Sequence, residues 1–120
     1  MQYRPTAEEL LDAIADLLGQ EVLEAVPPHL THRIRVSENL LRILQREAAQ
    51  GPEADRREVE RLTGLLGHDG TLLDLRSELA DRLRTSDDEA FDKQAWEALV
   101  AITRADLAIA KPGHDGWEGE

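Results

Sequence analysis

The stretch LTHRIRVSENLLRILQREAAQ, residues 30–50, carries the clearest helical signal of the chain. Its apolar residues recur every three or four positions, the spacing of one face of an α-helix. At about 100° per residue they cover roughly half of the circumference. They include Leu30, Ile34, Val36, Leu40, Leu41, Ile43 and Leu44. A helix with so wide an apolar arc contacts several neighbours, so we predict a central helix that ends at Gly51.

Four further segments combine helical spacing with residues that begin or end helices. Thr6 and Glu9 form a capping box for the first of them. Strand signals are absent, because no segment alternates in β-branched and aromatic residues. The expected limits of these helices are Thr6 to Pro27, Pro52 to Gly67, Thr71 to Arg84, and Asp88 to Pro112. The pattern predicts an all-α fold.

The expected architecture is a single-domain bundle of about five helices. The 120 residues suffice for one domain with its own core, and we place that domain at residues 1–111. Residues 112–120 are rich in glycine and acidic residues, and we expect them to be a disordered tail.

Charge and composition exclude several classes of function. There are 25 acidic and 14 basic residues, for a formal net charge of −11. A field of this sign repels phosphate backbones and anionic lipid, so we expect neither nucleic acid nor a membrane as partner. The chain has no cysteine, which excludes disulfides and thiolate chemistry. The first residues lack the apolar stretch of a signal peptide, and we expect a cytoplasmic protein.

No motif for catalysis or cofactor binding is present. His29 and His32 could share a helix face, but a metal site would need at least one more ligand. The segment from Gly64 to Gly67 lacks the lysine and hydroxyl residue of a phosphate-binding loop. No serine or threonine lies in a nucleophile motif. We therefore predict a protein that is not an enzyme and has no cofactor or metal.

Four polar residues in the 30–50 segment form a stripe opposite the main apolar face. They are Arg35, Asn39, Arg42 and Arg46, at relative positions i, i+4, i+7 and i+11. Three guanidinium groups could hold a carboxylate or phosphate, or contact a partner. The alternative is that the stripe pairs with the protein's own excess of acidic side chains.

Asp106 is the second polar residue of interest. Its helical neighbours are Ile102, Thr103, Ile109 and Ala110, so we expect a partly buried carboxylate. A buried charge is costly unless it is paired. We favour a structural ion pair with an arginine from another helix over a functional carboxylate.

Several segments together resemble a bacterial family of small helical proteins described as a domain of unknown function. They are Arg4-Pro5-Thr6 with Glu9-Leu10-Leu11; Arg35-Val36 with Asn39, Leu41 and Arg46-Glu47; Leu79-Ala80 with Leu83-Arg84; and Leu107-Ala108-Ile109-Ala110 with Pro112. The chain departs from the family pattern at Thr85-Ser86, where a glycine is expected, and at Lys111, where an asparagine is expected. These departures concern local turns.

The resemblance implies a function that the residues alone do not. Members of the family are encoded beside kinases of the aminoglycoside-phosphotransferase type and beside acyl-CoA dehydrogenases. This implies a non-catalytic accessory subunit of a kinase acting on hydroxyacyl-CoA substrates, in the catabolism of short acids. The resemblance also singles out Arg35, Asn39, Arg46 and Glu47 as scaffold or interface residues, with Glu47 a candidate for a buried charge.

Two other classes of function stay open. One is a protein that binds a small anionic ligand through the arginine stripe, and the other is a homo-oligomeric helical protein. An exposed apolar patch beside the stripe would favour a protein partner. A closed pocket lined by the stripe would favour a ligand.

Overall fold

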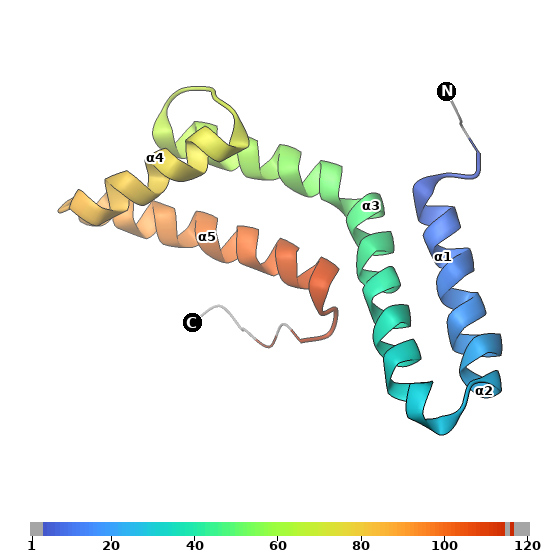
Figure 1. The fold of residues 1–120 in the computed structure, drawn as a ribbon. Coiled ribbons are helices and arrows are strands. Elements are labelled where there is room, and N and C mark those ends of the chain that lie inside the picture. Colours follow the sequence, from blue (N-terminus) through green and yellow to red (C-terminus); the bar gives the residue numbers. More distant parts are fainter. Residues whose placement is uncertain (1–3, 115, 117–120) are drawn as a thin grey trace. The chain divides into compact units, whose positions relative to one another are not determined.

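The computed structural model describes residues 4–114 and 116, and it confirms the all-α class (Figure 1). This part of the chain has four helices and no strand. In the first, α1 (Ala7–Leu17) continues through the π-helical turn η1 (Leu18–Val22) into α2 (Leu23–Ala25). A short 3-10 turn, η2 (Pro28–Leu30), precedes the long α3 (Thr31–Leu66). The other two helices are α4 (Leu72–Thr85) and α5 (Glu89–Ala110).

The helix starts expected from capping residues are confirmed. The Thr6 side chain accepts a hydrogen bond from the backbone N–H of Glu9 at 3.1 Å, and Thr71 does the same for Asp74 at 3.1 Å. Asp88 caps α5, since its carboxylate accepts from the backbone of the helix's first turn. Each cap satisfies a donor that the helix itself leaves without a partner.

The expected break at Gly51-Pro52 is wrong. Helix α3 runs through both residues, so the second and third predicted helices are one, and the helices number four instead of five. A proline inside a helix costs about 3 kcal/mol and a glycine about 1 kcal/mol. Strong helix formers on both sides offset part of this cost. Just after the proline, the Glu53 side chain accepts hydrogen bonds from Arg56 and from Arg57 of the same helix, the latter at 3.0 Å.

The chain divides into two compact units, residues 1–51 and 52–120, and the boundary falls inside α3 at Gly51-Pro52. A single closed bundle over residues 1–111 stays a prediction. Of the expected tail, residues 112–114 and 116 lie outside any helix, while 115 and 117–120 lie outside the described residues. No helix in the described part is long and apolar enough to span a bilayer.

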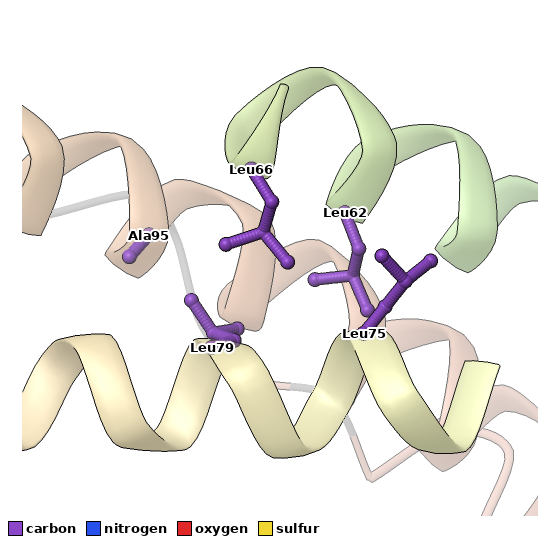
Figure 2. Close-up of a cluster of buried hydrophobic side chains, with 5 residues drawn as sticks. All are labelled: Leu62, Leu66, Leu75, Leu79 and Ala95. Carbon is purple, nitrogen blue, oxygen red and sulfur yellow. The ribbon is translucent and has the colours of Figure 1, made fainter. Parts of the chain in front are cut away.

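The second unit has a well-formed hydrophobic core (Figure 2). Its buried side chains come from three helices: Leu62 and Leu66 from α3, Leu75 and Leu79 from α4, and Ala95 from α5. Leucines from α3 and α4 point toward each other in Figure 2. Helix α3 then ends at Gly67, whose φ of +85° is the left-handed conformation that glycine adopts without strain.

Candidate functional site

The arginine stripe divides into an inner and an outer part. Arg42 is half-buried and reaches across to α1, where it donates to Asp12 at 2.5 Å and to Asp16 at 2.6 Å. The hydrogen bond to Asp16, followed by that to Asp12, raises the pKa of Arg42 above its ordinary value. Arg35 and Asn39, by contrast, are exposed.

Arg42 therefore makes the intramolecular pairs that the alternative interpretation expects. Its guanidinium also lies 3.9 Å from the carboxylate of Glu38 on its own helix. Arg46 is half-buried and has an interaction of its own. A guanidinium that already contacts two carboxylates has little capacity left for an anionic ligand, so the stripe does not act as a set of three available cations.

The Glu38 side chain of α3 lies against Gly19 in η1. A Cβ atom built at Gly19 would lie 2.5 Å from the Glu38 carboxylate. A larger residue at Gly19, in the π-helical turn η1, would require the Glu38 side chain to move. The ion pairs between α1 and α3 are those of Arg42 with Asp12 and Asp16.

The first unit leaves six large apolar side chains exposed among its described residues. Among its described residues only Ala15 and Gly51 are buried. The exposed apolar residues lie on two helices: Leu10, Ile14 and Leu17 on α1, and Val36, Leu40 and Leu44 on α3. They belong to the helical apolar pattern of the sequence, whose other members, such as Leu11, Leu41 and Ile43, are half-buried.

A second exposed apolar surface lies on α5. Trp96 is 59% exposed and Leu99 is 38% exposed. Buried Ala98 and Ile109 lie on the side of the helix away from Trp96, while buried Ala95 lies one turn before Leu99 on the same face. The apolar surface of α5 therefore extends beyond the side that packs on the core. We call the side with Trp96 and Leu99 the outer face of α5.

Among the described residues the buried charge is Glu58, which was not predicted from the sequence. Its side chain is 7% exposed and forms a two-pronged ion pair with Arg76, at 2.5 and 2.7 Å. This hydrogen bonding raises the pKa of Arg76. The sequence does contain a signal for this burial, because Glu58 lies four and eight residues before the core residues Leu62 and Leu66, on the same helix face.

The expected burial of Asp106 and Glu47 is wrong, since both residues are exposed. Asp106 lies beside buried Ile109, but Thr103 and Ala110 are themselves exposed, so the carboxylate stays at the edge of the apolar face. Its charge still adds to the raised pKa of Arg76. Glu47 lies along the exposed side of α3, with its carboxylate near Gly51.

His68, at the turn between α3 and α4, interacts with Glu78. Its Nε2 atom lies 2.8 Å from that carboxylate and its Nδ1 atom 2.9 Å from the backbone oxygen of Asp69. The hydrogen bond to the Asp69 backbone, then that to Glu78, raises the pKa of His68 above its ordinary value of 6.5. Arg82, 3.2 Å from Glu78, opposes the shift.

We expect His68 to stabilise the fold more in acid than in base. Because its pKa is higher in the folded than in the unfolded chain, the contribution is complete below about pH 6.5 and is lost as the pH rises through the folded pKa. His68→Gln should therefore lower the urea midpoint at pH 5.5 and change it less at pH 8.5. An equal loss at both pH values would contradict this.

Potential metal ligands do not gather at one point. His29 and His32 are both exposed, and the described residues contain no group of three or more His, Asp or Glu side chains placed to hold a metal ion. The features that distinguish this chain are therefore its two exposed apolar surfaces and the ion pairs within each unit.

Comparison with known proteins assigns a family without an activity. Residues 24–114 match the family described as Domain of unknown function (DUF6285). The match contains α3, α4 and α5 and leaves out α1. No curated protein and no solved structure shows significant similarity to the chain.

Proposed function

Because this chain belongs to the DUF6285 family of domains of unknown function, we propose its role from its surfaces: a non-catalytic accessory subunit that binds a protein partner. The proposed partner is a phosphotransferase-fold kinase acting on hydroxyacyl-CoA type substrates in the cytoplasm, as the family resemblance implies. An acyl-CoA dehydrogenase is a second candidate partner. In this proposal the chain needs no cofactor of its own.

The observation that carries the proposal is the outer face of α5. Tryptophan is among the residues that contribute most to binding energy in protein interfaces. Trp96 is more than half exposed, although α5 offers a buried core face on its other side. Leu99 extends the same surface by about one helical turn, with half-buried Val100 beside it. An exposed patch of this kind is typical of a binding surface.

Charge supports a partner with a basic surface around an apolar centre. Among residues 52–120, acidic residues outnumber basic ones by 17 to 9. Such a field speeds the approach of a positively charged surface and disfavours acidic ones. The small-anion alternative loses support, because Arg42, in the middle of the stripe, is held by Asp12 and Asp16.

We expect the chain to bind the kinase encoded beside it and Trp96→Ala to weaken that binding about 30-fold or more, the loss of an interface anchor. The matched control is Leu73→Ala, because Leu73 is 75% exposed on α4 of the same unit. Isothermal titration of the kinase with each variant measures the difference, and circular dichroism confirms that both variants fold.

A fluorescence measurement gives an independent readout. The chain has two tryptophans, so Trp117→Phe leaves Trp96 as the only one. Adding the kinase should shift the emission of Trp96 to shorter wavelength as water is excluded from the indole. If the kinase does not bind at micromolar concentrations, or binds Trp96→Ala as well as it binds the unchanged chain, this proposal is wrong.

A further inference from the structure

The exposed apolar residues of α3 form a stripe with charged residues at its two ends. Val36, Leu40 and Leu44 are 42%, 54% and 52% exposed. Arg33 and Glu47, both exposed, extend the same stripe in the two directions along the helix. At about 100° per residue, all five lie within an arc of about 80°. We call these five residues the α3 stripe.

The α3 stripe is symmetric in spacing and opposite in charge about Leu40. Val36 and Leu44 each lie four residues from Leu40, which is about 6 Å along the axis. Arg33 and Glu47 each lie seven residues from it, or about 10.5 Å. If the helix is reversed end to end about Leu40, apolar positions fall on apolar ones and the basic position falls on the acidic one.

We infer that a second copy of this chain binds along the α3 stripe, with the two α3 helices antiparallel. A twofold axis beside Leu40 brings the two Leu40 side chains together and places Val36 of each copy against Leu44 of the other. It also places Arg33 of each copy beside Glu47 of the other. Such isologous contacts are the commonest way in which identical chains pair.

The other exposed apolar surfaces lack this self-complementarity. On α1, the residues seven before and after Ile14 are Ala7 and Glu21, so reversal brings no opposite charges together. On α5, the residues seven before and after Val100 are Lys93 and Leu107. Of these three surfaces, α3 alone pairs opposite charges seven residues either side of its apolar centre, and this pairing does not involve the outer face of α5 proposed for the kinase.

Three half-exposed aliphatic side chains per copy make a small interface. Its total area falls at or below about 1,200 Å², the lower end for stable complexes. We therefore expect a dimer that dissociates on dilution. Sedimentation velocity between about 5 and 500 µM should show conversion of monomer to dimer, in a range where weak complexes form.

Cysteine cross-linking tests the register, because the chain has no cysteine of its own. Leu40→Cys should form a disulfide-linked dimer on mild oxidation, since the two positions meet at the axis within the reach of a disulfide. Val36→Cys and Leu44→Cys should each cross-link poorly alone but efficiently when the two variants are mixed. Leu73→Cys, at an exposed position of α4, is the control for cross-linking by random collision.

Charge exchange tests the proposed ion pairs. Arg33→Glu and Glu47→Arg should each weaken the dimer by about tenfold, because each places like charges opposite each other twice. The double variant Arg33→Glu/Glu47→Arg should restore it. A monomer at every concentration would overturn the inference. So would efficient cross-linking of Val36→Cys with itself, which indicates a parallel pair, or failure of the double variant to recover the dimer.

Discussion

Replacing Leu62 with alanine should lower the free energy of unfolding by about 3–4 kcal/mol, one of the two largest effects that we expect in this protein. Leu62 has no exposed surface and lies in the core shared by α3, α4 and α5 (Figure 2). The change removes buried apolar atoms and leaves a cavity that the surrounding leucines fill only in part. Urea denaturation followed by circular dichroism measures it.

The matched control is Leu73→Ala. Leu73 has the same side chain but is 75% exposed, so its truncation removes little buried surface. We expect a change of less than about 0.5 kcal/mol there, as for ordinary surface substitutions. A loss at Leu62 no larger than that at Leu73 would show that the three helices do not share this core.

Replacing Arg76 with alanine should lower the free energy of unfolding by about 2–3 kcal/mol. The substitution leaves the Glu58 carboxylate, which is almost fully buried, without its partner. Breaking a fully buried pair costs about 3–5 kcal/mol. The loss here should be smaller, because the Arg76 side chain is 52% exposed and water screens part of the interaction.

The comparison for Arg76→Ala is Arg57→Ala. Arg57 also contacts a glutamate, Glu53, at 3.0 Å, but both side chains are largely exposed. Exposed ion pairs contribute little to stability. Equal losses at Arg57 and Arg76 in urea denaturation would contradict the assignment of Glu58 as the buried charge that needs a partner.

The arrangement of ion pairs changes the interpretation of the arginine stripe. On one helix, three arginines at helical spacing are consistent with a ligand site, an interface or internal pairing. For Arg42 the structure favours internal pairing, because Asp12 and Asp16 on α1 lie within hydrogen-bonding distance of its guanidinium. Arg35, which is exposed, stays available to a partner.

Local chemistry was enough to determine the helical class and most helix ends from the sequence. A capping hydroxyl such as Thr6 or Thr71 satisfies donors three residues away, so its effect needs no distant residue. Gly67 likewise ends α3 by its own backbone conformation. The apolar spacing within each helix is equally local.

Where local signals compete, the outcome is known only from the tertiary structure. Gly51-Pro52 favours a break by a few kcal/mol, yet α3 continues through both residues in the folded chain. Burial of a charge depends on which helix packs over it, and so Glu58 is buried by the core of the second unit while Asp106 is exposed. The partner of Arg42 lies at least 26 residues away on α1, and no spacing within one helix specifies which helix packs beside it.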